Sequence, residues 1–235
     1  MNNIPRPWEA PTVPVAGSGD RFPVRHIYCV GRNYAEHAKE MGGDATKEPP
    51  FFFCKPADAI VPVAAGSVGH VRYPMGTKDF QHEIELVVAI GRAGAARTPA
   101  NALELVFGYA TGLDMTRRDL QIAMREKKRP WDIGKAFPQA APIAPIHRAA
   151  TIGHPTKGEI AVDVNGVTRQ RGDLSQLIWD VPNTIAFLSQ LYELLPGDLI
   201  YTGTPAGVGP VVAGDRLDGR IDGLTSLSIV VDPAR

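Results

Sequence analysis

Two carboxylates one residue apart stand in an apolar run that otherwise has the pattern of a buried strand. In "KDFQHEIELVVAIG", residues 78–91, Glu83 and Glu85 alternate with Ile84 and Leu86. Alternate side chains of a strand share a face, so the two carboxylates would point the same way, about 7 Å apart at the backbone. Like charges so placed raise each other's pKa unless a cation lies between them, and a divalent metal is one such cation. The alternative is a solvated strand face, which needs no metal.

A third carboxylate, Asp114, ends an apolar strand in "GYATGLDMTRRDLQ", just before a predicted helix. Considered alone, it could be the N-cap of that helix. Thr116, with Asp119 three residues later, resembles a capping box, which would leave Asp114 free for another role. Three carboxylates at strand ends, without a histidine pair at ligand spacing or a cysteine ligand, predict a site for a hard cation. Mg²⁺ fits such a site, Mn²⁺ is the alternative, and Zn²⁺ fits poorly.

A histidine and a carboxylate, His37 and Glu40, lie three residues apart in "NYAEHAKEM", which has the composition of a short helix. On a helix, residues at this spacing share a face and their side chains can touch. A carboxylate at one imidazole nitrogen fixes the tautomer and raises the basicity of the other nitrogen, as a general base for water requires. The alternative is a solvent-facing pair on a charged helix.

Two further segments could bind an anion. Lys135, in "PWDIGKAF", stands between glycine and apolar residues; a surface lysine is the default interpretation, and the apolar context makes an anion-binding role plausible. The loop "YTGTPAGVGPV" has three glycines and Thr204, and its backbone N–H groups could bind a small carboxylate, although a structural turn explains it equally well. The run of residues 51–53, three phenylalanines, could be an apolar wall of a pocket or part of the core.

The elements that must position these side chains are short and mixed. Apolar and β-branched runs predict strands over 26–31, 84–91, 198–201 and 226–232, and Asn165-Gly166 predicts the turn of a hairpin. Helices are predicted over 33–43, 116–128 and from about Pro182 to before Pro196. Because strands do not alternate regularly with helices, the pattern favours an α+β, mostly β fold over a doubly wound parallel sheet. In the helix over 116–128, the spacing places two residues inward, Leu120 and Met124, and four outward, Arg117, Arg118, Arg125 and Lys128.

The overall composition is close to the average for globular proteins. The 235 residues suit an N-terminal extended arm over 1–22 and a single domain over 23–235. The 25 acidic and 25 basic residues balance, so the charge gives no reason to expect nucleic acid or a membrane surface as a partner. Two cysteines, without a secretory signal, favour a reducing cytoplasm. Cys29 lies in a predicted strand and Cys54 in an apolar segment, so neither is expected to act as a nucleophile.

The motifs together resemble the fumarylacetoacetate hydrolase family. They occur in the family's order from about residue 23 to the C-terminus, as "IYCVGRNYAEHAKEMG", "PPFFFCKPADAIV", "QHEIELVVAIG", "GYATGLDMTRRDLQ", "RPWDIGKAF" and "YTGTPAGVGPV". The resemblance implies the mixed β-sandwich roll of this family, a homodimer, and a lid helix at about 33–48. Within the family, the sequence is most similar to the enzymes that hydrolyse fumarylpyruvate and other acylpyruvates.

The resemblance also implies a role for each candidate residue. The metal ligands would be Glu83, Glu85 and Asp114, and the water-activating pair would be His37 and Glu40. Arg118, Gln121 and Lys135 would hold the 2-oxo acid end of a small substrate, Lys135 would also assist catalysis, and Thr204 would contact a carboxylate. One departure from the family pattern is Pro138 after "GKAF", where an acidic or hydroxyl residue is common.

These roles imply Mg²⁺-dependent cleavage of a C–C bond in an acylpyruvate by activated water. Decarboxylation of oxaloacetate, or isomerisation or dehydration of a related 2-oxo acid, could use the same metal site and stays open as an alternative. A non-catalytic 2-oxo acid sensor would not need a base such as His37. The sequence does not fix the acyl group.

Overall fold

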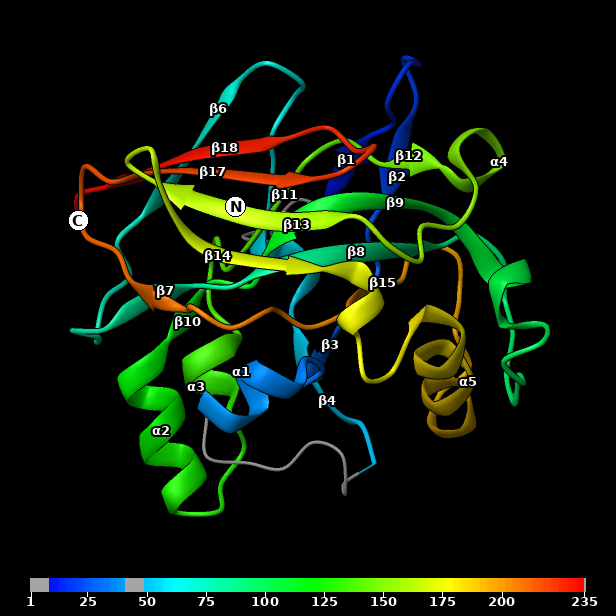
Figure 1. The fold of residues 1–235 in the computed structure, drawn as a ribbon, viewed down its shortest axis with the longest axis horizontal. Helices are drawn as coiled ribbons and strands as arrows, with labels where there is room; N and C mark the ends of the chain where they lie inside the picture. Colours follow the sequence, from blue (N-terminus) through cyan, green and yellow to red (C-terminus); the bar gives the residue numbers. More distant parts are fainter. Residues whose placement is uncertain (1–8, 41–48, 235) are drawn as a thin grey trace, which may run out of the picture.

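The largest sheet in the described residues, 9–40 and 49–234, has eight strands and forms the middle of the molecule in a computed structural model (Figure 1). Seven of its strands follow the spatial order β4 (Phe51–Lys55), β3 (Ile27–Gly31), β15 (Leu199–Tyr201), β8 (Ile84–Ile90), β9 (Val106–Leu113), β11 (Ala141–Ile143) and β5 (Ile60–Pro62). The eighth strand, β12 (His147–Arg148), pairs with β9. The strands expected near 26–31, 84–91 and 198–201 are all present.

The two central strands, β8 and β9, pair antiparallel, with Ile84 opposite Leu113 and Glu85 opposite Gly112. All seven residues of β8 are buried, so both faces of this strand are covered. The alternative of a solvated strand face around Glu85 is therefore wrong. The sequence pattern could not exclude it, because segments distant in sequence cover both faces: a second sheet covers the Ile84 face, and Lys135 and the Gly203 loop cover the carboxylate face.

That second sheet has five strands and covers β8 and β9 (Figure 1). Its order is β14 (Val167–Asp173), β13 (Glu159–Val164), β17 (Arg216–Ile221), β18 (Leu227–Asp232) and β6 (Val68–Arg72). The sheets approach closely at Gly219, where a Cβ atom would lie 2.7 Å from Ile84 Cδ1. Two packed sheets confirm the predicted mostly β sandwich roll. Asn165 and Gly166, at φ 52° and 77°, form the predicted hairpin turn between β13 and β14.

Two smaller sheets complete the β structure of the described residues. One has the order β10 (Thr116–Arg117), β7 (Phe80–His82) and β16 (Gly209–Pro210). The other is a hairpin of β1 (Thr12–Pro14) and β2 (Arg21–Pro23), in which Val13 is fully buried. The described part of the expected extended arm is thus folded onto the domain. Residues 1–8 of that arm lie outside the described residues, and the division into an arm and one catalytic domain stays a prediction.

The helices α1, α2 and α3 gather at one end of the large sheet, away from α5 (Figure 1). The α-helices are α1 (Ala35–Glu40), α2 (Arg118–Glu126), α3 (Asp132–Lys135), α4 (Ala149–Ile152) and α5 (Val181–Leu191), and the 3-10 helices are η1 (Ala57–Ala59), η2 (Ala102–Leu105) and η3 (Leu174–Gln176). Helix α5 begins near Pro182 as predicted, because the Asp180 side chain caps it by accepting from the Asn183 N–H. The rest of the expected lid helix, residues 41–48, lies outside the described residues.

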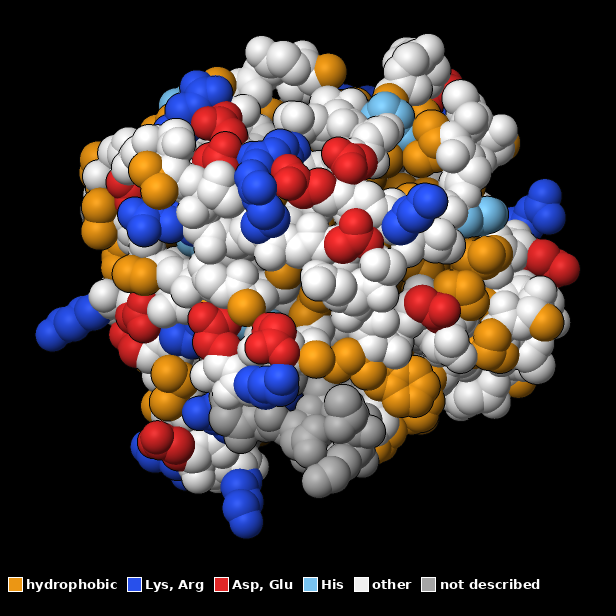
Figure 2. Space-filling model, viewed as in Figure 1, with side chains coloured by type: hydrophobic (Ala, Val, Ile, Leu, Met, Phe, Trp, Pro, Cys, Tyr) orange, Lys and Arg blue, Asp and Glu red, His pale blue; other side chains and the backbone are white. Residues whose placement is uncertain are grey.

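The visible surface carries acidic and basic side chains interspersed, in keeping with the balanced charge of the sequence (Figure 2). In the part of the chain that the structure describes, every helix is too short or too polar to span a membrane.

Candidate active site

The register of β8 and β9 brings the three predicted metal ligands together. Glu83 directly precedes β8 and Asp114 directly follows β9, and the Asp114 N–H donates to the Glu83 carbonyl oxygen at 2.8 Å. Glu85, two residues into the same run, points to the same place. One carboxylate oxygen from each of the three residues lies within 4.8 Å of the others. The three carboxylates therefore form a cluster in the structure, as the strand periodicity and the position of Asp114 at a strand end predict.

Three cationic side chains surround the three carboxylates. Lys135 Nζ donates to Glu83 Oε2 at 2.9 Å and to Asp114 Oδ2 at 2.8 Å. Arg118 Nη2 donates to Glu83 Oε1 in a short contact. Lys55 Nζ lies 2.7 Å from Asp114 Oδ1, although the angles are not those of a hydrogen bond. Because all these side chains are buried, each charge depends on its partners and not on water.

The cations act unequally on the two glutamates. Burial alone would raise the pKa of Glu83, but Lys135 and Arg118 outweigh it and hold the pKa well below its ordinary value. Burial raises the pKa of Glu85 well above its ordinary value, and the charges of Asp114 and Glu83 add to the effect. The Glu85 carboxylate accepts a hydrogen bond from the Gly203 N–H at 2.8 Å. The cations of the site thus contact Glu83 and Asp114 directly, whereas the hydrogen-bond partner of Glu85 is a backbone N–H.

The cluster fits a divalent cation. All three side chains offer carboxylate oxygens, which are the ligands of Mg²⁺ and Mn²⁺ in proteins. The buried Asp114 Oδ1 lacks a hydrogen bond, so it keeps an acceptor direction for a ligand. Each carboxylate has about four lone-pair directions, and those of Glu83 can serve both its cationic neighbours and a metal.

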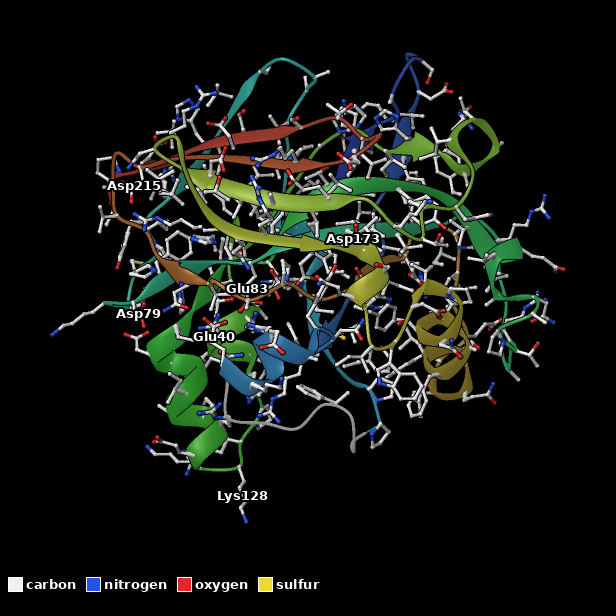
Figure 3. All side chains as sticks on the ribbon, viewed as in Figure 1. Glu40, Asp79, Glu83, Lys128, Asp173 and Asp215 are labelled. Carbon is white, nitrogen blue, oxygen red and sulfur yellow. The ribbon has the colours of Figure 1, made fainter. Side chains whose placement is uncertain are left out.

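His37 on α1 lines the same pocket as Glu83 and Glu85, and Glu40 on the same helix is its carboxylate partner. His37 Nδ1 lies 3.2 Å from Glu40 Oε2, and the Gly207 N–H donates to the same oxygen at 3.3 Å. His37 is 5% exposed, so the alternative of a solvent-facing pair is wrong for the histidine. Burial lowers the pKa of His37, against the opposing effect of Glu83 and the hydrogen bond to Glu40. A neutral imidazole with Nδ1–H donating to Glu40 would leave Nε2 as the basic atom. Figure 3 shows Glu40 on α1 and Glu83 at the edge of the sheets above it.

Helix α2 places two predicted substrate-binding residues in the pocket, and this corrects the expected orientation of the helix. Arg118 and Gln121 are its buried residues, and Arg118 Nη1 donates to Gln121 Oε1 at 2.5 Å. Arg118 was expected to face solvent because charged side chains usually do, but here the Glu83 carboxylate compensates its charge. By contrast, Lys128 lies exposed at the far end of the helix (Figure 3).

The predicted N-cap of α2 is also wrong. The helix begins at Arg118 without a side-chain cap, and the Thr116 hydroxyl is buried in the site. There it accepts from Lys135 Nζ at 2.7 Å and lies 3.3 Å from Glu83 Oε1. Asp119, the other half of the expected capping box, instead binds Thr77 and the Lys78 N–H. Contacts from distant strands outweigh the local capping preference.

Lys135 is 2% exposed, so the alternative of a surface lysine is wrong. Burial alone would lower its pKa, but Asp114 and Glu83 outweigh burial and raise it. Lys55 was not recognised as a site residue. It ends the aromatic strand β4 and is 2% exposed, with Nζ donating to the carbonyl oxygens of Met115 and Lys135 at 3.1 and 2.6 Å. The sequence signal that could have identified Lys55 is its position directly after an apolar strand run.

Thr204 lines the pocket, but its hydroxyl is already bonded within the protein. Its Oγ1 donates to the Ile84 carbonyl oxygen at 2.7 Å and accepts from Gln170 Nε2 at 2.8 Å. A contact with a substrate carboxylate would therefore fall to the backbone N–H of this loop. Gln170 also binds His82 Nδ1, at 2.8 Å, which is consistent with a structural role for His82.

Aromatic side chains form part of the pocket wall. Phe53 and Trp131 line the hollow, which encloses about 440 Å³ between atoms, including the open space at its mouth. Of the three phenylalanines considered from the sequence, Phe53 thus belongs to the wall, and Phe51 packs edge-on against Trp131 at 5.2 Å between ring centroids. Pro138, the departure from the family pattern, lies exposed in a turn and is not part of the lining.

Fold and site together define an enzyme of the fumarylacetoacetate hydrolase type whose carboxylate cluster could hold a divalent metal, and comparison with known proteins supports the family. The family model "Fumarylacetoacetate (FAA) hydrolase C-terminal" matches residues 26–232. The chain therefore belongs to the fumarylacetoacetate hydrolase family. The predicted family is confirmed, and with it the expectation of an enzyme.

Individual relatives are similar over almost their whole length. A fumarylpyruvate hydrolase from a Ralstonia species is 45% identical, over 81% of this chain and 97% of the relative. The mouse mitochondrial oxaloacetate tautomerase FAHD1 is 39% identical, over 88% of this chain and 91% of the relative. The structure of a fumarylpyruvate hydrolase from Pseudomonas aeruginosa, in complex with Mn²⁺ and pyruvate, superposes with a TM-score of 0.97 at 55% identity, over 99% of this chain and 100% of that chain.

Proposed function

We propose that the protein hydrolyses a C–C bond in an acylpyruvate, with fumarylpyruvate as the first candidate substrate, in a reaction that depends on a divalent metal. The observation that carries this proposal is that Glu83 and Glu85 of the carboxylate triad line one pocket with His37, whose Nδ1 contacts Glu40 at 3.2 Å. A metal site alone would suit several reactions of 2-oxo acids. A buried histidine with a carboxylate partner at the same site adds a base for water.

The metal would be held by Glu83, Glu85 and Asp114, with Mg²⁺ as the first candidate and Mn²⁺ as the alternative. When bound, it would supply positive charge that polarises the oxygens of a 2-oxo acid and stabilises negative charge that develops during cleavage. The Pseudomonas relative was solved with Mn²⁺ and pyruvate, and pyruvate is one product of the proposed reaction.

His37 would act as the general base. With Nδ1–H held by Glu40 at 3.2 Å, Nε2 takes a proton from water as the water oxygen bonds to the distal keto carbon of the substrate. The C–C bond breaks, and its electron pair leaves with pyruvate as the enolate. The enolate needs one proton to become pyruvate, which equals the one proton that His37 took from water. A positioned base of this kind contributes about 10²–10⁴-fold to the rate.

The cations would hold the 2-oxo acid end. Lys135 and Arg118 are buried beside Glu83, so a carboxylate or enolate in this pocket meets positive charge in a poorly hydrated setting. Gln121, which accepts from Arg118, keeps its amide N–H₂ as a donor for the substrate. These assignments follow from position in the pocket, and the loop of Thr204 closes the opposite side.

Oxaloacetate chemistry is the second candidate, because a relative of 39% identity is an oxaloacetate tautomerase. Decarboxylation or tautomerisation of oxaloacetate could use the same metal and cations. Decarboxylation needs no attacking water, so it should tolerate loss of His37 better than hydrolysis does.

The test measures both reactions on chelator-treated protein before and after addition of Mg²⁺ or Mn²⁺. We expect fumarylpyruvate hydrolysis to vanish with the chelator and to return with metal. His37→Ala should keep Mn²⁺ binding, measured by calorimetry, and lose hydrolysis. His70→Ala is the matched control, because His70 also pairs with a carboxylate, Asp232, but is exposed and not part of the pocket lining. Full activity without metal, or in His37→Ala, would contradict the proposal.

The family resemblance also predicts a homodimer in the cytoplasm that acts on a small 2-oxo acid, without nucleic acid or membrane partners. Sedimentation of the purified chain would test the dimer directly.

A further inference from the structure

Two arginines in the active-site pocket are not used by the proposed hydrolysis. Arg32 and Arg125 line the same hollow as Glu83, His37 and Lys135, and both are half-buried. The 2-oxo acid end of a substrate already has Arg118, Lys135 and the metal for its charge. Two additional arginines in the lining of one small pocket can serve a second negative group on the ligand, beside their contacts within the chain.

Helix α2 fixes the distance between the two ends of the pocket. Arg118, Gln121, Ile122 and Arg125 all line the hollow, and their spacing places them on one face of the helix. Arg118 contacts Glu83 at the metal end. Arg125 follows seven residues later, so its backbone lies about 10 Å farther along the helix axis.

Arg32 reaches the pocket from the other wall. It directly follows β3 and adopts a φ of 56°, a conformation uncommon for residues other than glycine. Its guanidinium carbon lies 5.8 Å from the ring centroid of Phe51, which in turn packs against Trp131. The aromatic residues thus hold the arginine at the pocket wall. Both Arg32 and Arg125 have interactions within the chain, but five N–H donors allow an arginine to serve a protein contact and a ligand together.

We propose that Arg125 and Arg32 bind a carboxylate at the far end of the acyl group, so that the substrates are acylpyruvates whose acyl half ends in a carboxylate. This inference rests on the proposed function and names the substrate class within it. Fumarylpyruvate has six bonds between its two carboxylate carbons, which span about 7 Å when extended, the length of two residues of extended chain. A ligand of that length, with one carboxylate at the Arg118 end of α2, would place its other carboxylate where the Arg125 side chain can contact it. A guanidinium in a half-buried setting binds carboxylates through two parallel hydrogen bonds.

The test compares two acylpyruvates of equal length on the Mn²⁺-loaded enzyme. One is fumarylpyruvate, and the other, crotonylpyruvate, has a methyl group in place of the terminal carboxylate. We expect Arg125→Met to lower kcat/KM for fumarylpyruvate by about 10–100-fold, mainly through KM, since charged hydrogen bonds are lost. The same variant should change kcat/KM for crotonylpyruvate by less than about twofold, because no bond to a carboxylate is lost. Arg32→Met should have the same selective effect, and Arg125→Lys should restore part of the preference.

The matched control is Arg129→Met, which removes the same charge close to α2 from an exposed residue outside the lining of this pocket. It should leave both substrates unaffected. The inference is overturned if the wild type uses both substrates equally, or if Arg125→Met slows both to the same extent.

Failure of the proposed function gives a different result. If the wild type hydrolyses neither substrate, calorimetric binding of the two acylpyruvates still decides the inference. Tighter binding of fumarylpyruvate that disappears in Arg125→Met supports the carboxylate site, and equal binding of both compounds overturns it.

Discussion

Lys55 and Asp114 form an ion pair beneath the candidate metal site, with 2.7 Å between Nζ and Oδ1 and both side chains fully buried. On its other oxygen, Asp114 accepts from Lys135. A carboxylate held between two lysines keeps its place and its charge without water. Lys55 therefore orients a metal ligand without being one, and it also fixes the backbone of Lys135 through the carbonyl oxygen.

Removal of Lys55 should destabilise the fold more than removal of a surface cation with the same pairing distance. Lys55→Met should lower the free energy of unfolding by about 3–5 kcal/mol, because it leaves Asp114 buried with one cation fewer. Arg148→Met breaks a pair with Asp20, also at 2.7 Å but largely exposed, and should cost less than about 1 kcal/mol. Urea unfolding in the presence of a chelator measures both. Similar losses of unfolding free energy in the two variants would mean that the buried pair stabilises the fold no more than the exposed pair does.

The neutral substitution Glu85→Gln should separate metal binding from folding. The glutamine keeps the size of the side chain and its carbonyl oxygen for the Gly203 N–H, so the apo protein should fold. The Mn²⁺ affinity should fall by at least about 100-fold, since loss of a ligand exceeds the 10–100-fold effect of losing a partner of a ligand. Isothermal calorimetry measures the affinity, and thermal unfolding without metal provides the control. Unchanged Mn²⁺ binding would remove Glu85 from the proposed ligand set.

The pH dependence of hydrolysis should report His37. Burial lowers its pKa from the ordinary value of 6.5, so the imidazole is neutral at pH 7 and able to accept a proton. Activity should rise with pH through a midpoint that lies below 6.5, because the protonated histidine cannot act as a base. The profile of kcat/KM between about pH 4.5 and 8 measures the midpoint.

Glu40→Gln provides the matched variant for that profile. The charged hydrogen bond to Glu40 raises the pKa of His37, so replacing the carboxylate with a neutral amide should move the acidic limb to lower pH. The plateau rate should also fall, because a neutral amide raises the basicity of the imidazole less than a carboxylate does. A limb that does not move would mean that another group controls the profile.

The sequence predicts the triad because two local rules hold here: alternate strand residues share a face, and a strand ends at Asp114. It predicts less well where contacts come from distant segments. Arg118 was assigned to the solvent side of its helix, because only the folded strand β8 brings the Glu83 carboxylate that neutralises it. For the same reason Thr116 was assigned to a helix cap, while Lys135, nineteen residues later, binds its hydroxyl. The Gly203 loop, which bonds the buried Glu85 carboxylate, also comes from a distant segment and lies beyond any local pattern.

The glycine-rich loop offers a matched test of how closely the site is packed. Gly207 and Gly214 both have a φ of 95°, but a Cβ at Gly207 would lie 2.2 Å from the Arg169 carbonyl oxygen, and one at Gly214 meets nothing within 4 Å. Both Gly→Ala changes strain the backbone, by about 1–2 kcal/mol. Gly207→Ala must also displace the loop, so it should lower the free energy of unfolding further.

Because the Gly207 N–H binds Glu40, that displacement should also slow hydrolysis, whereas Gly214→Ala should leave the rate unchanged. Urea unfolding and kcat measured on the same two variants test both statements. Equal stability losses with equal rates would show that the loop relaxes freely. In that case the Gly207 contact could not be what holds Glu40 against His37.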